Sequence, residues 1–338
     1  MPKNTNPVRM HNSSSVNNKK IVVLCGGSGG SELLTCLRGH ASITAILPST
    51  DDGGSGGWCR EKFNMIAPGD FRRALVALSF SKNAKLKKDF LFRYNFGEMK
   101  GQVVGNLAIA TAFEKTKDFD KAISEMAEVL DVRDTILPVT KELTTLCAEL
   151  EDGTIIKGER NFSFDSKHSE GYGNRDMSKK IKRVFTEPVV QIHPEARKAI
   201  LEADTVILSV GDIYSSIIAN LVIDGARDAL QRTKAKVVMF VNSLACHGES
   251  EDFNASDFVK TVERYIGSGA IDIAIVSEKI QAGALKEFAK LKPRFAKPDI
   301  ENLPKHVQPV IANWNTTKGA FKADPKKVLS ILEKLRVL

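Results

Sequence analysis

Two glycine-rich segments follow directly after two apolar, strand-like stretches, and they contain the residues best suited to bind a phosphorylated ligand. The first begins at Gly26, behind the apolar residues 21–25, and the second begins at Asp51, behind residues 43–47. Glycine lets the backbone approach a ligand closely, and a helix beginning after such a turn favours an anion. We therefore expect phosphate-binding turns that contain Gly26, Gly27, Ser28, Gly29, Gly30 and Gly53.

The second segment adds two adjacent carboxylates, Asp51 and Asp52. Asp51 lies about where the acidic residue of a dinucleotide-binding fold would hold a ribose hydroxyl. The pair could also bind Mg²⁺ that bridges to phosphate oxygens, because hard oxygen ligands suit this ion. Asp-Gly is also a common turn dipeptide, so a solvated turn is the alternative. Two such segments at neighbouring strand ends favour a functional role, with Asp51 and Asp52 as catalytic or metal-binding residues.

Generic nucleotide-binding patterns do not match the first segment. The dinucleotide pattern Gly-x-Gly-x-x-Gly would require glycine at position 32, where Glu32 stands. The Walker pattern Gly-x-x-x-x-Gly-Lys-Ser/Thr is also absent. A nicotinamide-dependent dehydrogenase or a P-loop ATPase is therefore disfavoured.

Several later residues are further candidates for the same site. Asp70 follows Pro68-Gly69 and suits either a helix cap, which we favour, or a ligand; Arg72 or Arg73 could clamp a phosphate. Asn106 is either a helix cap or a contact to a base or sugar. The polar residues after two later strands should reach the edge of the sheet where α/β folds bind ligands. These residues are Gly211, Asp212 and Asn242.

The histidine and cysteine residues give weaker signals. His247 follows a strand and could act as a general base, although a surface position is favoured. Cys25 ends a buried strand and is expected to be a small core residue rather than a catalytic thiol. The five cysteines form no Cys-x-x-Cys pair, which favours reduced thiols and a cytoplasmic location.

Composition limits the classes of partner. The net charge is +8, but the basic residues are spread out, and the two densest groups are residues 85–88 and 179–183. Few aromatic residues lie between them, so a solvated basic surface that attracts anionic small ligands is favoured over a nucleic-acid site. No apolar run of about 18 residues exists, which predicts no membrane span. The polar residues 1–19 lack the apolar core of a secretion signal and are expected to form a disordered tail.

The remaining pattern predicts an α/β fold with a doubly wound, mostly parallel, Rossmann-like sheet and a helical insertion. We expect one domain over residues 20–338, with the insertion at about 68–130 and a surface excursion at about 161–180. Strands are predicted at 21–25, 43–47, 135–138, 144–150, 155–157, 205–210, 236–241 and 271–276. Helices are predicted at 31–38, 85–96, 106–115, 118–130, 194–202, 223–232, 257–266 and 325–335, with a further helix opening at 68–70.

Taken in order, these motifs resemble the CofD-like family, which includes the gluconeogenesis factors and the 2-phospho-L-lactate transferases. The resemblance covers about residues 20–335 and is closer to the gluconeogenesis-factor branch, through Asp51-Asp52-Gly53-Gly54 and Pro68-Gly69-Asp70. Further matching segments are Gly105-Asn106-Leu107, Leu146–Thr154, Arg183-Val184-Phe185, Ile213–Ile217, Asn220-Leu221 and Gly248-Glu249-Ser250.

The resemblance implies a ligand cleft at the strand ends. In the gluconeogenesis-factor branch it implies UDP-sugar binding and support of cell shape and gluconeogenic growth, and in the other branch a magnesium-dependent transfer of a phospholactyl group. The sequence departs from the family pattern at three places. Asp212 replaces a typical hydroxyl residue, and residues 244–247 read Leu-Ala-Cys-His where the family usually has Met-Thr-Gln-Pro. Lys322 replaces an arginine, and lysine cannot make the same fork of contacts. The sequence leaves open the base, the sugar, whether a reaction is catalysed, and whether two chains pair as a homodimer.

Overall fold

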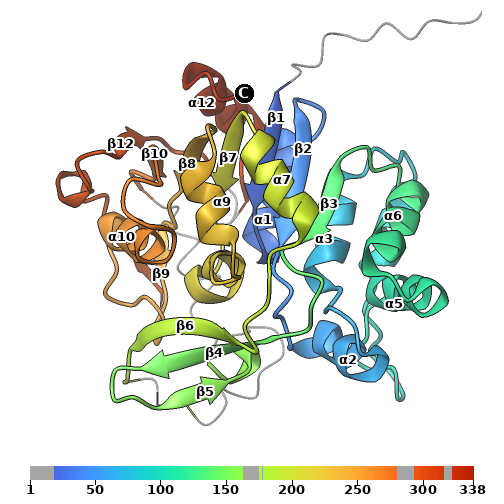
Figure 1. The fold of residues 1–338 in the computed structure, drawn as a ribbon. Helices are drawn as coiled ribbons and strands as arrows, with labels where there is room; N and C mark the ends of the chain where they lie inside the picture. The colour runs from blue at the N-terminus through green and yellow to red at the C-terminus, as the bar shows by residue number, and fades with distance from the viewer. Residues whose placement is uncertain (1–18, 163–174, 177, 280–292, 316–321) are drawn as a thin grey trace, which may run out of the picture.

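The protein is described from a computed structural model that carries side chains. The structure describes residues 19–162, 175–176, 178–279, 293–315 and 322–338 (Figure 1). The predicted tail, residues 1–19, and the excursion at 161–180 therefore lie largely outside the described residues.

A seven-stranded sheet forms the centre of the molecule, and every neighbouring pair of its strands is parallel. The strand order is β12-β10-β8-β7-β1-β2-β3. This arrangement confirms the predicted doubly wound α/β fold. The strands are β1 (Lys20–Leu24), β2 (Ser42–Leu47), β3 (Thr135–Pro138), β7 (Thr205–Leu208), β8 (Lys236–Phe240), β10 (Ile273–Val276) and β12 (Gln308–Ile311).

The chain reverses its direction across the sheet at β1. It builds β1, β2 and β3 outward on one side, then returns to place β7 on the other side of β1 and continues outward to β12. Such a reversal opens a crevice at the carboxyl ends of the two central strands, where α/β proteins bind ligands. In this protein the segments that follow β1 and β7 stand at that position.

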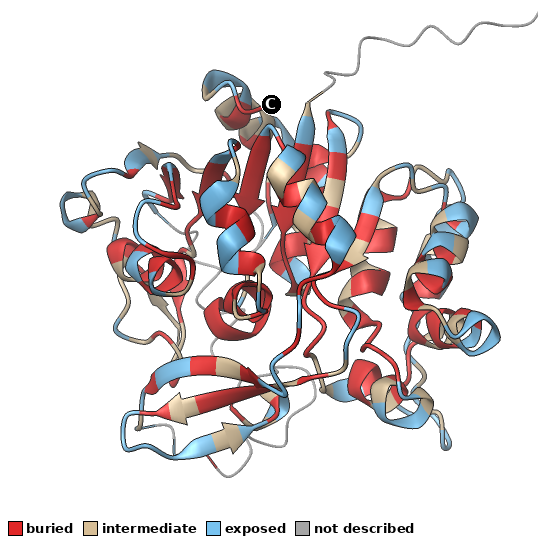
Figure 2. Ribbon diagram, in the orientation of Figure 1, coloured by how far each residue is buried: buried red, intermediate tan, exposed pale blue. Residues whose placement is uncertain are grey.

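Side chains of the central strand alternate between two apolar layers. Ile21 and Val23 pack in one core cluster, whereas Val22 and Leu24 pack in the other. Figure 2 shows the parallel strands as buried and the surrounding helices as buried on one side only. A sheet covered on both faces explains why its strands are apolar throughout rather than alternating.

Helices cover both faces of this sheet. The layer containing Ile21 includes α1 (Gly27–Leu37), α3 (Gly69–Leu78), α5 (Val104–Thr116), α6 (Phe119–Val129) and α12 (Pro325–Lys334). The layer containing Val22 includes α7 (Pro194–Glu202), the π-helix η2 (Ile213–Ile218), α8 (Ala219–Leu221), α9 (Ala226–Arg232) and α10 (Ala255–Ile266). Among the described residues, no helix is both long enough and apolar enough to span a bilayer.

The predicted helical insertion is present, but one of its helices is shorter than expected. Helix α4 (Ala84–Phe90) ends before the predicted residue 96. The chain then folds back on itself, because Tyr94 N–H donates to the Gln102 carbonyl and Val104 N–H donates to the Phe92 carbonyl. Aromatic residues alternate along 92–96, which favours an extended strand over a helix. We call residues 91–103 the aromatic hairpin.

A second, antiparallel sheet has the order β5-β4-β6 and consists of β4 (Thr145–Leu150), β5 (Ile155–Lys157) and β6 (Ile181–Glu187). The hairpin between β4 and β5 was predicted, whereas β6 and the sheet itself were not. Figure 1 shows this sheet beyond the carboxyl ends of the parallel strands. Its position places the short 3-10 helix η1 (Glu159–Asn161) next to the segment after β2.

Other elements also differ from the prediction. Helix α1 begins at Gly27 rather than at Ser31, and the second glycine segment is the start of an unpredicted helix, α2 (Gly54–Phe63). The sequence predicts loops at both helix starts because glycine has a low helical propensity. Strand β12 was missed because it contains Pro309, which is tolerated at this sheet edge. Two short strands, β9 (Leu244–Ala245) and β11 (Arg294–Phe295), pair separately, and a 3-10 helix η4 covers Ile300–Asn302.

The close packing of α1 on β1 gives a first prediction. A Cβ atom at Gly30 would lie 2.7 Å from Cβ of Cys25, so the Gly30→Ala variant must push the helix away from the strand. We expect a loss of about 1–3 kcal/mol in the free energy of unfolding, measured by urea denaturation. Thr35→Ala on the exposed side of the same helix is the control and should change stability by less than about 0.5 kcal/mol. Equal stability of Gly30→Ala and wild type would contradict the packing described.

Candidate functional site

Both glycine segments form the first turns of helices at the carboxyl ends of neighbouring strands. Gly26 is the N-cap of α1 behind β1, and Gly53 is the N-cap of α2 behind β2. Neither N-terminus is capped by a side chain, so backbone N–H groups of both first turns keep hydrogen-bonding capacity. Two helix N-termini therefore contribute partial positive charge to the same edge of the sheet.

The segments after β1, β7 and β8 lie against each other at the point of chain reversal. A Cβ atom at Gly26 would lie 3.1 Å from Cα of Ser216, and one at Gly211 would lie 3.4 Å from the Gly26 carbonyl oxygen. The side-chain amide of Asn242 donates to the Gly211 carbonyl at 2.6 Å. Asn242 thus fixes the segment after β7, and Asp212 stands at the N-cap of η2 beside it. Their role in ligand binding stays a prediction.

Asp51 lies between the N-termini of α2 and α3. Its Oδ1 accepts a hydrogen bond from Gly53 N–H at 2.9 Å. Its Oδ2 would lie 3.0 Å from a Cβ atom at Gly56 and 3.3 Å from one at Gly69. Glycine at both positions leaves room for this carboxylate, so one role of the glycines at the two helix starts is to accommodate Asp51.

Asp70 is not the helix cap that was favoured from the sequence. Pro68 is the N-cap of α3, and no side chain caps this helix. Asp70 lies inside the first turn, pairs with Arg73 at 3.4 Å, and directs Oδ2 to within 3.0 Å of a Cβ position at Gly26. The Asp70 carboxylate therefore faces the first glycine segment rather than its own helix start.

The neighbouring Asp52 points away from Asp51, toward the antiparallel sheet. Its Oδ1 accepts from Arg160 N–H at 2.9 Å, and its Oδ2 would lie 2.6 Å from a Cβ atom at Gly158. The two adjacent aspartates thus diverge instead of chelating one ion together. Over the described parts of the chain, no group of three or more His, Cys, Asp or Glu side chains is arranged to hold a metal ion.

Glu159 is a fifth carboxylate at this edge, and the sequence analysis missed it. Its Oε2 is buried and has no hydrogen-bond partner among the residues that the structure describes. Burial raises the pKa of Glu159 well above its ordinary value, and the charges of Asp51, Asp52, Asp70 and Asp212 raise it further. No local sequence pattern marks Glu159. It reaches this edge because η1 follows β5 of the unpredicted antiparallel sheet.

Asp51 also titrates unusually. Burial raises its pKa to about 6, the nearby Asp70 charge raises it as well, and the Gly53 N–H bond and Arg73 oppose the shift. Perturbed carboxylates of this kind cluster at functional sites. The edge of the sheet therefore combines helix N-termini with carboxylates that resist ionisation.

The arginines near the site have different environments, and the predicted contact of Arg72 or Arg73 with a phosphate stays a prediction. Arg72 is buried, and its guanidinium donates to Oδ1 of Asn106 at 3.0 Å. Burial lowers the Arg72 pKa to about 10, which fits a largely internal group. Arg60 donates to the Ser49 and Thr144 carbonyls. Arg73, with about one third of its side chain exposed, is the better candidate to meet a ligand.

Asn106 belongs to the same internal network. It is almost fully buried, and its amide donates to the Ser55 hydroxyl at 3.1 Å. Ser55, in the first turn of α2, also accepts from Val103 N–H at 3.0 Å. Asn106 and Arg72 thus hold the starts of α2 and α5 together, which places them behind the site.

The weaker candidates have ordinary environments. The Cys25 thiol is buried, as predicted, and burial raises its pKa. His247 is half-buried and pairs with Glu251. Lys322, one of the departures from the family pattern, places a positive charge near Glu32 of α1. Burial raises the pKa of Glu32, and the charge of Lys322 opposes this shift in part.

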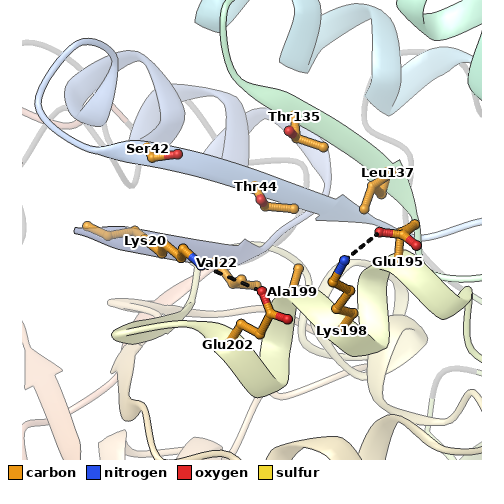
Figure 3. Close-up of a pocket in the computed structure, with 11 residues that line it drawn as sticks. Lys20, Val22, Ser42, Thr44, Thr135, Leu137, Glu195, Lys198, Ala199 and Glu202 are labelled. Carbon is orange, nitrogen blue, oxygen red and sulfur yellow. Dashed lines mark ion pairs between the residues drawn. The ribbon is translucent and has the colours of Figure 1, made fainter. Parts of the chain in front are cut away.

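A cavity of about 340 Å³ lies elsewhere, between α7 and the face of β1, β2 and β3 (Figure 3). Its lining includes Lys20 and Ser42, the first residues of β1 and β2, so it lies toward the opposite ends of the strands. Its charged side chains pair with one another, Lys20 with Glu202 and Lys198 with Glu195. We therefore do not assign this cavity to the candidate site.

The raised pKa of Asp51 gives a prediction for stability. The folded protein binds a proton at Asp51 more tightly than the unfolded chain, so this group lowers stability as pH rises from about 4 to about 6. Asp51→Asn keeps the acceptor for Gly53 N–H and removes the charge. The shift would correspond to about 3 kcal/mol at most, and solvent screening reduces the expected gain at pH 7.5 to about 1–2 kcal/mol.

The measurement compares urea denaturation of Asp51→Asn and wild type at pH 4 and pH 7.5. The gain should vanish at pH 4, where the native Asp51 is already neutral. Asp228→Asn on the surface of α9 is the matched control and should show no such difference. A variant less stable than wild type at pH 7.5 would rule out the charge repulsion inferred here.

Several known proteins have sequences related to this chain. Residues 21–314 match the family described as "2-phospho-L-lactate transferase CofD". The chain is 36% identical to a gluconeogenesis factor of Halalkalibacterium halodurans, over 81% of this chain and 82% of that protein. It is 34% identical to the gluconeogenesis factor of Bacillus subtilis, over 93% and 96% of the two chains.

A solved structure has the same fold. The crystal structure of a UPF0052-family protein from Bacillus halodurans superposes with a TM-score of 0.85 at 32% identity, covering 94% of this chain and 99% of that chain. The matched region includes every strand of the parallel sheet and the segments that follow them. The chain therefore belongs to the CofD family, and the relatives that it resembles include proteins named gluconeogenesis factors.

Proposed function

We propose that this protein binds a nucleotide sugar, a UDP-sugar, at the carboxyl ends of β1, β2 and β7. The observation that carries the proposal is that two helices without side-chain caps, α1 and α2, begin at the carboxyl ends of the neighbouring strands β1 and β2, beside the point where the sheet reverses direction. Diphosphates suit this arrangement because helix N-termini offer backbone N–H groups and partial positive charge. Residues Gly26 to Gly30 would lie along the diphosphate.

The carboxylates of the site constrain what else must bind. Asp51, Asp70 and Glu159 would repel a diphosphate, and burial already opposes ionisation of Asp51 and Glu159. A divalent cation would reverse this effect by bringing positive charge between the carboxylates and the phosphate oxygens. We therefore expect the site to bind an anionic ligand together with a cation more tightly than the anion alone.

Mg²⁺ fits the donor set. Its usual protein ligands are one or two carboxylates, with water and substrate phosphate oxygens completing the coordination. Asp51 and Glu159 are the residues that we propose hold it, since Oε2 of Glu159 is buried without a partner. Asp52 was the second ligand expected from the sequence, but its oxygens are directed to Arg160 and Gly158. Bound Mg²⁺ would supply electrostatic stabilisation of phosphate charge.

The biological role follows from the relatives. Proteins named gluconeogenesis factors match this chain over most of their length, which supports a role in growth on gluconeogenic carbon. We extend the proposal to support of cell shape, as the family resemblance implies, in the cytoplasm. Asp212, which stands where a hydroxyl residue is typical, would change the preferred ligand within the nucleotide-sugar class.

A second candidate is a magnesium-dependent transferase of phospho groups, of the 2-phospho-L-lactate transferase type. The family description names such an enzyme, and a carboxyl group with a pKa of about 6 suits proton transfer near neutral pH. In this case Asp51 would hold a proton or a cation close to the reacting phosphate. Both candidates use the same site and differ in whether a bond breaks.

Calorimetry with UDP-N-acetylglucosamine tests the binding proposal. Wild type should bind the ligand more tightly with Mg²⁺ than with EDTA. Asp51→Asn should weaken binding about tenfold or more in Mg²⁺ but leave or improve it in EDTA, because the carboxylate helps only through the cation. Asp228→Asn should match wild type in both buffers. Absence of heat with any uridine or guanosine nucleotide would count against the proposal.

Turnover separates the two candidates. Incubation of the protein with a phospholactyl donor linked to guanosine diphosphate, a deazaflavin acceptor and Mg²⁺, followed by chromatography of the nucleotides, should leave the donor intact if the protein only binds it. Release of a nucleoside monophosphate that Asp51→Asn and Asp52→Asn both abolish would favour the transferase. Turnover that survives in both variants would exclude the two aspartates from the chemistry.

A further inference from the structure

The aromatic hairpin carries an unusual set of exposed apolar side chains. Leu91 and Phe92 are each 49% exposed and Phe96 is 62% exposed. The rings of Phe92, Tyr94 and Phe96 form a row with centroids 5.4 Å and 5.7 Å apart, each pair edge to face. Three of the exposed large apolar side chains among the described residues thus fall within six consecutive positions. Apolar surface gathered in this way marks an interaction site more often than isolated exposed residues do.

The end of the hairpin that contains Gly97 and Gly101 has open space around it. A Cβ atom placed on either glycine would meet no atom of the described residues within 4 Å. Arg93 lies opposite the row of rings in the strand alternation, and its guanidinium donates to the Gly101 carbonyl across the hairpin. The aromatic row is therefore held by its own hairpin and projects into open space.

The segment that carries the aromatic row is rich in basic residues. Residues 82–103 contain six basic and two acidic residues, a net charge of +4, which is half of the +8 of the whole chain. One of these acids, Asp89, is already paired with Lys85 at 2.7 Å. The basic group at residues 85–88, interpreted from the sequence as a solvated surface, is therefore continuous with an exposed apolar tip. The basic residues are Lys82, Lys85, Lys87, Lys88, Arg93 and Lys100.

We propose that the aromatic hairpin docks this protein on an anionic phospholipid surface. Phenylalanine and leucine side chains on a projecting tip enter the boundary of a bilayer without needing a shaped partner pocket, and nearby lysines are attracted to acidic headgroups. A second copy of the chain fits less well, because it would bring a second +4 cluster against the first. Single-stranded nucleic acid fits less well too, since the edge-to-face rings partly cover the faces on which bases stack.

The base of the hairpin adjoins the candidate site. Val103 N–H donates to the Ser55 hydroxyl in the first turn of α2, and Phe90, just before the hairpin, contacts the Gly105 position at the start of α5. A docked hairpin would hold the candidate site close to the membrane surface. The docking proposal does not depend on which ligand that site binds.

Vesicle flotation with the full chain tests the proposal. At low salt, the protein should float with vesicles of three parts phosphatidylcholine to one part phosphatidylglycerol and stay unbound with pure phosphatidylcholine. Sodium chloride at 0.5 M should release most of it, because screening removes the attraction of the lysines. Binding to neither kind of vesicle, or equal binding to both, would overturn the proposal.

Variants separate the apolar and charged contributions. Phe92→Ser/Phe96→Ser should reduce vesicle partitioning about tenfold or more, and Phe96→Ser alone should reduce it measurably with less risk to the fold. Lys85→Gln/Lys88→Gln/Lys100→Gln should also reduce it about tenfold or more. The matched controls are Val189→Ser/Ile155→Ser, which are exposed apolar residues on other surfaces, and Lys234→Gln/Lys236→Gln/Lys305→Gln. The controls should bind like wild type.

Two further measurements exclude other occupants. Circular dichroism must show that each variant is folded. Light scattering without vesicles should give the same mass for wild type and Phe92→Ser/Phe96→Ser. A larger mass that these substitutions abolish would replace the proposal with self-association, and tight binding of single-stranded DNA that they abolish would replace it with nucleic-acid binding. Full vesicle binding by Phe96→Ser and by the double variant would also overturn it.

Discussion

The close approach of α1 to the ends of β1 and β7 is the constraint on which the rest of the site depends. Cβ atoms at Gly29 and Gly30 would lie 2.7 Å from the Val210 carbonyl oxygen and from Cβ of Cys25, so only glycine permits this contact. With the helix this close, its N-terminus opens at the level of the strand ends, next to the segments after β2 and β7. A helix displaced by larger side chains would leave the carboxylates without the partial positive charge that faces them.

Much of the sheet was predictable because its signals are local. Runs of apolar residues such as 236–240 identify strands buried on both faces, and Pro194 at the first turn of α7 fixes a helix start. The failures have physical causes as well. The glycines among residues 54–57 suggest a loop by propensity, but tertiary packing around Asp51 makes this segment helical. The last residues of the helix predicted at 85–96 instead form the extended hairpin, which is held by hydrogen bonds with residues 101–104.

The candidate site shows the same division between local and distant information. Gly26, Asp51 and Gly211 were placed at one edge by topology alone, and the distances between their neighbours agree with that placement. Glu159 could not be found in this way. It lies in the 3-10 helix η1, which follows β5 of the separate antiparallel sheet and contacts Asp52 through Arg160 N–H, more than a hundred residues later. Likewise, the directions of Asp51 and Asp52 depend on backbone N–H groups of Gly53 and Arg160, which no spacing rule specifies.

Charge explains how these parts could work together. The carboxylates at the strand ends oppose an anionic ligand, while half of the net positive charge lies on residues 82–103. The base of that segment adjoins the site at Ser55, but salt weakens the effect of its exposed lysines. The groups that can act directly on an anionic ligand at the strand ends are Arg73, the helix N-termini or a bound cation. The exposed part of the basic segment can then act on a separate partner.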